Sequence, residues 1–107
     1  MKKILGIIPA RGGSKGIPGK NIRMLDGKPL IYYSVHSAFT SKIIDRLILT
    51  TDSVEIAEIG KNLGAEVPFL RPVNLAQDDT PMGPVIEHVV NFVENSGWRA
   101  DIVLLLQ

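Results

Sequence analysis

The sequence predicts an α/β fold in which a mainly parallel sheet carries helices on both faces. Short segments that are apolar throughout alternate with longer segments whose apolar residues recur at helical spacing. Strands without polar alternation are typical of parallel sheets, which are covered on both sides. A loop rich in glycine and basic residues follows the first apolar segment, where ligands bind in folds of this class.

Four strands and three helices are expected in alternation. The strands are residues 3–9, 46–51, 66–70 and 101–106, and the helices are residues 30–41, 54–63 and 84–95. The first and last strands look buried, and both are far too short to span a membrane. Pro29 suits the first turn of the first helix, Ser53 is expected to cap the second, and Gly64 is expected to end it.

Composition bounds the class of protein. A chain of 107 residues is long enough for one domain with a core, and 45% apolar and 21% charged residues are ordinary for a globular protein. The absence of cysteine excludes a disulfide framework and thiolate metal sites. No signal-peptide pattern follows the first apolar run, so we expect a cytoplasmic protein.

Charge is distributed unevenly along the chain. Residues 1–28 contain seven basic residues and one acid, whereas the remainder contains five basic residues and ten acids. The positive charge therefore gathers around the glycine-rich loop and predicts an anionic ligand there. Nucleic acid is not expected, because the rest of the chain is acidic and has no stripe of aromatic and basic residues.

The loop after the first strand predicts a triphosphate site. It reads RGGSKGIPGKN over residues 11–21, with three basic residues, no acid and four glycines. Glycines let backbone N–H groups approach an anion, while Arg and Lys supply full charges. The loop matches neither Walker A, which requires Gly-Lys followed by Ser or Thr, nor GxGxxG. P-loop NTPases and Rossmann dehydrogenases are therefore poor fits.

Taken with the rest of the chain, this loop resembles the acylneuraminate cytidylyltransferase family. The similarity runs from IIPARGGSKGIPGKN through LDGKPLI, LILTTDSVEIAEIGKNLGAEVPFLRPVNLAQDDT and the final DIVLLLQ. It implies a three-layer α/β/α Rossmann-like nucleotidyltransferase fold of the nucleotide-diphospho-sugar transferase type. It also implies a Mg²⁺-dependent homodimer that transfers CMP from CTP to the anomeric hydroxyl of a nine-carbon 2-keto-sugar acid and releases pyrophosphate.

The resemblance implies roles for particular residues of the loop. Arg11, Lys15 and Lys20 would hold the triphosphate of CTP, with backbone help from Ala10 and Ser14. Asn21 would bind near the nucleotide and position the reacting phosphate. The residues expected to carry the chemistry are Arg11, Lys20 and Asn21, since Arg and Lys stabilise pyrophosphate as it departs.

Three further residues gain roles from the resemblance. Arg71, in the FLRP segment, would read the cytosine. Thr80 begins the stretch expected to line the base and ribose pocket, although Pro81-Met82-Gly83 replaces the small hydroxyl residues usual in the family. Gln107 would reach the sugar acid. No metal ligand is assigned within the chain, because the Mg²⁺ ligands of the family are expected beyond Gln107.

Residues 1–107 are expected to form the N-terminal, CTP-binding part of a single cytidylyltransferase domain. The chain stops directly after a strand, so we expect a truncated or partly represented protein. Sialic, legionaminic and pseudaminic acids all remain open as substrates. Two alternatives also remain open, a 3-deoxy-manno-octulosonate cytidylyltransferase and a non-catalytic nucleotide-binding fragment. Lys15-Gly16 and Lys20-Asn21 favour the acylneuraminate side over the former.

Other polar residues favour structural roles. Asp52 is expected to start the turn before the second helix. Adjacent aspartates such as Asp78-Asp79 are usually solvated. His36 and His88 have no partner at metal-ligand spacing in the sequence, and Trp98 is expected to serve packing.

Overall fold

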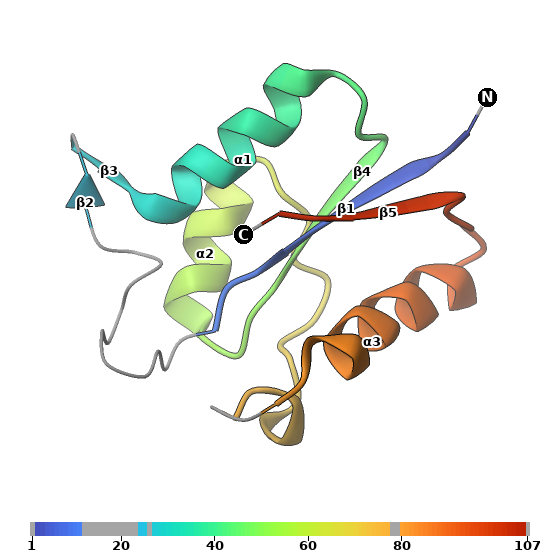
Figure 1. Cartoon of the computed structure of the whole chain (residues 1–107). Helices are drawn as coiled ribbons and strands as arrows, with labels where there is room; N and C mark the ends of the chain where they lie inside the picture. Colours follow the sequence, from blue (N-terminus) through green and yellow to red (C-terminus); the bar gives the residue numbers. More distant parts are fainter. Residues whose placement is uncertain (1, 12–23, 26, 78–79, 107) are drawn as a thin grey trace.

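The computed structural model describes residues 2–11, 24–25, 27–77 and 80–106. Within these ranges the main sheet has three parallel strands in the order β4-β1-β5. β1 (Ile4–Pro9) lies in the centre, between β4 (Arg46–Thr50) and β5 (Ile102–Leu105) (Figure 1). The predicted α/β class with a mainly parallel sheet is confirmed.

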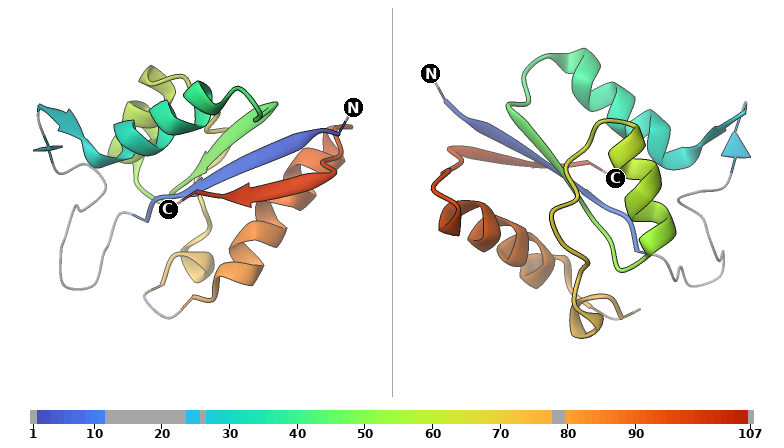
Figure 2. Two further views of the ribbon diagram at one scale, coloured as in Figure 1. Left: turned by 45° about the horizontal axis from the view of Figure 1, so that its top comes forward. Right: turned by 180° about the vertical axis from the view of Figure 1, so that it is seen from behind.

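The order of the strands creates a switch point between β1 and β5. Glu66 extends the sheet beyond β4 by a single parallel bridge to Ile48. β4 and then Glu66 thus add to the sheet on one side of β1, and β5, which comes last in the chain, pairs with the other side of β1. Because crossovers between parallel strands are right-handed, the crossover to β5 puts the last helix on the opposite face. Figure 2 shows the resulting three layers, with α1 (Leu30–Ser41) and α2 (Val54–Asn62) on one face and α3 (Met82–Asn95) on the other.

Two apolar clusters fill the spaces between the sheet and its helices. Alternation along β1 and β4 sends successive side chains to opposite faces. The cluster on the side of α1 and α2 consists of Ile8, Ala10, Ile31, Val35, Ala38, Leu47, Leu49, Ile56 and Ala65. The cluster on the side of α3 consists of Leu5, Ile7, Ile48, Val89 and Val93. Burial of one such aliphatic side chain contributes about 1.5–3 kcal/mol, so both faces hold the sheet in place.

The first two helices begin where the sequence predicts. In α1 the buried residues Ile31, Val35 and Ala38 recur at the spacing of one helix face. In α2 the Ser53 hydroxyl accepts a hydrogen bond of 3.2 Å from the backbone N–H of Ile56, so the predicted cap is confirmed. Both helices therefore take their starts from local sequence signals.

α3 begins at Met82, two residues before the predicted start. The prediction placed the helix start at Pro84, but a proline is also tolerated later in the first turn. The N–H groups of that turn have no partner within the helix in any case. From there Val85, Val89 and Val93 are buried along one face.

The prediction of a strand at residues 66–70 is wrong, because only Glu66 pairs with the sheet there. Glu66 makes two backbone hydrogen bonds of 2.9 Å with β4, and the ladder then stops. The next donor in a parallel ladder would be residue 68, which is a proline and has no N–H. Backbone pairing resumes only at Arg71, whose N–H donates to Thr51 O at 2.7 Å.

A two-stranded hairpin lies between the glycine-rich loop and α1, and the sequence analysis did not predict it. β2 (Met24–Leu25) pairs antiparallel with β3 (Lys28–Pro29). Gly27 in the turn has a φ of 80°, which glycine adopts without steric cost. The Asp26-Gly27 dipeptide is the sequence signal that could have indicated it.

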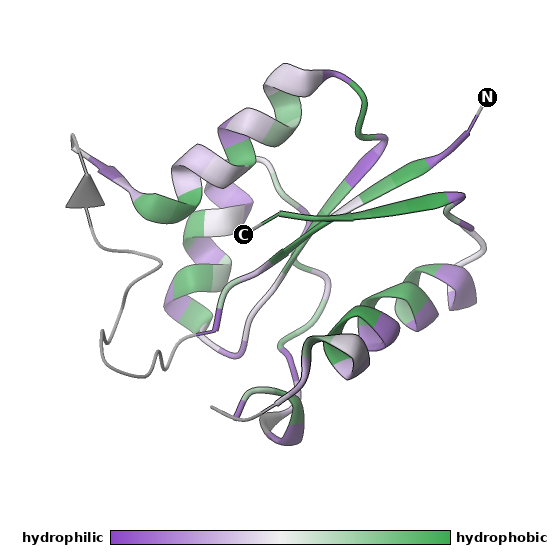
Figure 3. Ribbon diagram, in the orientation of Figure 1, coloured by the Kyte–Doolittle hydropathy of each residue, from purple (hydrophilic) through white to green (hydrophobic). Residues whose placement is uncertain are grey.

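β5 is less buried than its sequence suggests. It is apolar along its whole length (Figure 3). Yet Ile102, Val103 and Leu105 keep 37–38% of their surface exposed, and the expectation of a buried strand is wrong within the described residues. The strand lies at the edge of the sheet, where neighbours on one side only pack against it.

Ile48 tests the packing on the α3 face. It is fully buried, so Ile48→Ala is expected to lower the free energy of unfolding by about 2–5 kcal/mol, through lost apolar contact and a residual cavity. Ile43→Ala is the matched control, because Ile43 is 55% exposed and should cost far less. Urea unfolding of both variants measures the difference. Equal losses would contradict the assigned core.

Candidate functional site

The carboxyl ends of β1 and β4 meet at one point of the sheet. The register pairs Pro9 with Thr50, and the N–H of Ala10 donates to Thr50 O at 2.9 Å. Ala10 is fully buried and Arg11, half-buried, follows it directly. The residue that starts the predicted phosphate loop is therefore fixed at the end of the sheet, beside the switch point where such folds bind ligands.

Arg71 is bound to the same place. Its Nη2 donates to Thr50 O at 2.8 Å and its Nε to Thr50 Oγ1 at 3.2 Å. Its Nη1 donates to Leu75 O at 3.2 Å, which ties the following segment to the sheet. Arg71 is only 5% exposed, a degree of burial that arginine reaches only when it is well paired.

Three charged side chains influence one another at this end of the sheet. Burial lowers the pKa of the Arg71 guanidinium below the usual arginine value, the nearby Asp52 carboxylate raises it, and the Arg11 guanidinium lowers it further. Among the described residues, two guanidinium groups and one carboxylate thus act on one another at this end of the sheet. Positive charge of this kind attracts anions.

Thr50 and Thr51 are site residues that the sequence analysis missed. Both are fully buried, which is uncommon for hydroxyl side chains. Thr51 Oγ1 accepts from the backbone N–H of Ser53 at 3.1 Å, and so shapes the turn into α2. Ser53, not Asp52, occupies the cap position of that helix. Two adjacent hydroxyl residues at the end of an apolar strand are the signal that could have drawn attention to this pair.

The structure brings some of the predicted ligand residues together. Ala10, Arg11 and Arg71 converge on the ends of β1 and β4, as their hydrogen bonds and charge interactions describe. Thr80 is bonded to Gln77, since its Oγ1 accepts from the N–H of Gln77 at 2.9 Å. Five predicted residues lie outside the described ranges, namely Ser14, Lys15, Lys20, Asn21 and Gln107.

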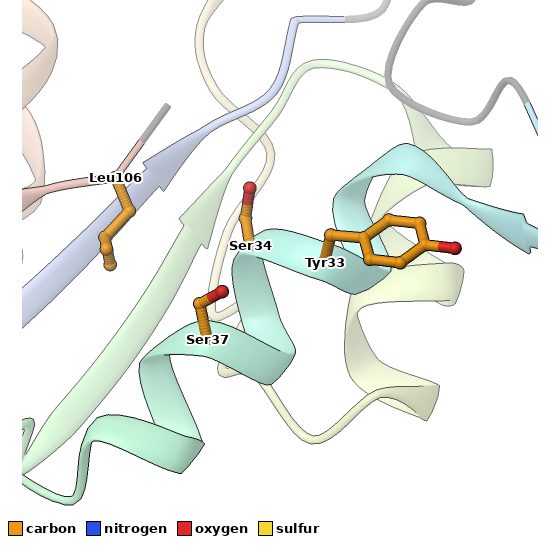
Figure 4. A pocket seen from close by; sticks show the side chains of 4 residues that line it. All are labelled: Tyr33, Ser34, Ser37 and Leu106. Atoms are coloured by element: carbon orange, nitrogen blue, oxygen red, sulfur yellow. The ribbon is translucent and has the colours of Figure 1, made fainter. Parts of the chain in front are cut away.

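A shallow depression of about 260 Å³ lies between α1 and the carboxyl end of β5 (Figure 4). Tyr33, Ser34 and Ser37 line it from the helix, and Leu106 lines it from the strand end. None of these was predicted to bind ligand. Leu106 is held beside β1, because its N–H donates to Ile7 O at 2.9 Å.

The remaining aromatic candidates make ring and cation–π contacts within the fold. His36 stacks on Tyr32 at 5.4 Å, and His88 meets the edge of Phe69 at 4.6 Å between ring centroids. The Lys3 ammonium and the Arg46 guanidinium both lie over the Trp98 ring. These cation–π contacts agree with the packing role predicted for Trp98. The Asp78-Asp79 pair lies outside the described residues.

The described ranges do not supply a metal site or a membrane span. Among these residues no group of three or more His, Cys, Asp or Glu side chains could hold a metal ion. No helix in the same ranges is long and apolar enough to cross a membrane.

The fold and this junction define a class, the nucleotide-binding α/β/α proteins with a ligand site at the strand ends. The cytidylyltransferase family model matches residues 5–104, and the chain belongs to this family.

Relatives support the same placement. The chain is 42% identical over 104 residues to the pseudaminic acid cytidylyltransferase of Campylobacter jejuni, covering 97% of this chain and 45% of that protein. It is 42% identical over 105 residues to the CMP-N,N'-diacetyllegionaminic acid synthase of Legionella pneumophila, covering 98% and 45%. It is also 42% identical over 89 residues to the N-acylneuraminate cytidylyltransferase of Escherichia coli O18:K1:H7, covering 83% and 21%. The predicted resemblance is confirmed, and the chain spans less than half the length of these relatives.

A solved structure agrees in fold. The CMP:2-keto-3-deoxy-manno-octonic acid synthetase complexed with CTP superposes with a TM-score of 0.73 at 25% identity. The match covers 98% of this chain and 39% of that one. The predicted Rossmann-like nucleotidyltransferase fold is confirmed.

Thr50 tests the hydrogen bonding at the junction. Thr50→Val keeps the shape of the side chain and removes the acceptor of Arg71 Nε, which leaves a buried donor unsatisfied. We expect a loss of about 1–3 kcal/mol in the free energy of unfolding. Thr40→Val, at an exposed position of α1, is the control and should change stability by roughly 0.5 kcal/mol or less. Denaturant unfolding compares the two, and a neutral Thr50→Val would remove the energetic role given to this bond.

Proposed function

We propose that the protein transfers CMP from CTP to the anomeric hydroxyl of a nine-carbon 2-keto-sugar acid of the sialic-acid type. The observation that carries this proposal is the junction at the ends of β1 and β4. There a basic glycine-rich loop leaves the sheet at Arg11, beside the buried Arg71, in a chain of the cytidylyltransferase family. Such a place suits a triphosphate, because charge and the switch point coincide.

The proposed reaction is a displacement at phosphorus. The anomeric oxygen of the sugar acid bonds to the α-phosphorus of CTP, and the bond from that phosphorus to the bridging oxygen breaks. Pyrophosphate leaves, and the hydroxyl proton is released. Negative charge grows on the leaving group, so Arg11, Lys15 and Lys20 are proposed to stabilise it, with Asn21 positioning the reacting phosphate.

The other ligand contacts are proposed from the family resemblance. Ser14 and Ala10 would contribute backbone N–H groups, Arg71 and Thr80 would face the base and ribose, and Gln107 would reach the sugar acid. Mg²⁺ stays an expected cofactor with ligands beyond Gln107, and no step is assigned to it. A homodimer and a cytoplasmic location likewise stay predictions.

The degree of similarity supports the proposed substrate class. Relatives named for pseudaminic, legionaminic and N-acylneuraminic acids share about 42% identity with this chain, against 25% for the octonic acid synthetase. These values support a nine-carbon acid. The structural likeness keeps the eight-carbon acid as the second candidate, and a non-catalytic nucleotide-binding fragment as the third.

The test of this function is CTP-dependent pyrophosphate release by the full-length protein. Sialic, legionaminic, pseudaminic and 3-deoxy-manno-octulosonic acids should be offered in turn. Release with one of the first three is the expected result. Release with the eight-carbon acid alone would favour the second candidate, and CTP binding without any release would favour the third.

The basic loop should carry the catalytic effect. Arg11→Ala and Lys20→Ala are each expected to lower turnover by about 100-fold or more, since one lost stabilising group costs that much in a preorganised site. Lys61→Ala, in the last turn of α2, is the matched control and should leave turnover unchanged. Steady-state kinetics and thermal unfolding are measured together. A loop variant that lost mainly stability would show that the loop assignment is wrong.

A further inference from the structure

The two strands that flank β1 differ in how well they are covered. In β4, residues 47–49 are at most 4% exposed. In β5, Ile102, Val103 and Leu105 are 37–38% exposed, although this strand contains no polar residue. Figure 2 shows β5 at the outer edge of the sheet. The apolar surface of β5 is therefore open where that of β4 is closed.

The outer edge of β4 is covered by a later segment of the chain through backbone hydrogen bonds. Leu47 O accepts the N–H of Glu66, and the N–H of Leu49 donates to Glu66 O, both at 2.9 Å. Two residues further on, Thr51 O accepts the N–H of Arg71 at 2.7 Å. Every second residue along this edge thus has a backbone partner on its outer side.

The equivalent backbone groups of β5 have no partner among the described residues. The N–H of Leu106 donates to Ile7 O at 2.9 Å, so the even-numbered positions of β5 turn their backbone toward β1. The N–H and C=O groups of Val103 and Leu105 therefore point away from β1, at the outer edge. This edge can accept a further strand.

The side chains of β5 are also incompletely covered on both faces of the sheet. The register pairs Val103 with Leu5, whose side chain belongs to the cluster beneath α3, so Val103 lies on the α3 face. Leu105 lies on that face as well, and Ile102 lies on the opposite one. Since residues on both faces stay more than a third exposed, neither layer of helices reaches across β5 in the described ranges.

β5 has none of the features that keep an exposed edge from pairing. Edge strands usually carry charged residues, prolines or bulges. Ile102–Leu105 reads IVLL, and its register with β1 runs through four consecutive pairs without a bulge. Such a strand is typical of the interior of a parallel sheet, where both faces and both edges are covered.

We propose that β5 is an inner strand of the sheet in the full-length protein, and that a strand from the part beyond Gln107 pairs with its outer edge. The chain spans 45% or less of the three relatives described above and 39% of the octonic acid synthetase. More than half of each of those proteins thus has no counterpart in residues 1–107, which is ample length for a covering strand. The inference goes beyond the proposed function and does not depend on CMP transfer.

Amide hydrogen exchange of the full-length protein, resolved for single residues by NMR, tests this pairing. The N–H of Leu104 points toward β1 and is the internal reference, because it is protected in either case. We expect the amides of Val103 and Leu105 to exchange about a thousandfold or more slower than in an unstructured peptide, as hydrogen-bonded amides of a stable sheet do.

A sample refolded from equal amounts of ¹⁵N-labelled and ¹³C-labelled protein shows which molecule supplies the strand. We expect nuclear Overhauser contacts from the Val103 and Leu105 amides to a strand of the same molecule. Contacts between differently labelled molecules alone would assign the edge to a second copy of the chain.

Val103→Lys in the full-length protein gives an independent measurement. A covering strand would bury the new ammonium group, so we expect Tm to fall by about 5–10 °C. Ile43→Lys is the matched control, because Ile43 is 55% exposed and lies between α1 and β4, away from the edge. It should shift Tm by about 2 °C or less.

Three results would overturn the inference. One is rapid exchange of Val103 and Leu105 beside a protected Leu104. The second is pairing with a second copy in the mixed sample, and the third is an equal change of Tm in Val103→Lys and Ile43→Lys. Hydrogen exchange of the wild type decides the matter if Val103→Lys does not fold.

Discussion

The structure depends on the parallel pairing of β1 with β4. Its register, from Leu5 opposite Arg46 to Pro9 opposite Thr50, makes both strands end at the same level. The two chain segments that leave the sheet there therefore start side by side, although they are about 40 residues apart in sequence. A shift of one residue would exchange the side chains that pack in the two apolar clusters, so the packing on both faces favours this register.

The two ends of the sheet carry different polar groups. At the amino end, aspartates close the structure: Asp45 accepts the N–H of Ile4 at 2.7 Å and Asp101 accepts that of Lys3 at 2.8 Å. The Arg46–Glu66 ion pair adds to this, and its hydrogen bond raises the pKa of Arg46. Among the described residues, the carboxyl end instead brings together Arg11, Arg71 and the carboxylate of Asp52.

Burying the Arg71 guanidinium costs free energy, which its hydrogen bonds offset. Water is replaced by carbonyl and hydroxyl acceptors from Thr50 and Leu75, and the charge of Asp52 compensates in part. The compensation fixes the guanidinium in one place. The guanidinium thereby ties the segment after Arg71 to the carboxyl end of β4.

The sequence by itself determined the alternation of helices with the strands β1, β4 and β5, and the helix starts at Leu30 and Val54. These follow from local signals, namely apolar periodicity, caps and glycines, which act over a few residues. The family also followed from sequence, because its motifs stand in order along the chain.

Only the tertiary structure decided how those parts meet. The order β4-β1-β5, the short bridge at Glu66 and the exposure of β5 depend on which strands become neighbours. The environment of Arg71 does too, because its acceptor Thr50 is 21 residues away in sequence. Local pattern carries no information about such a partner. Burial and hydrogen bonding across strands exist only once the sheet has formed.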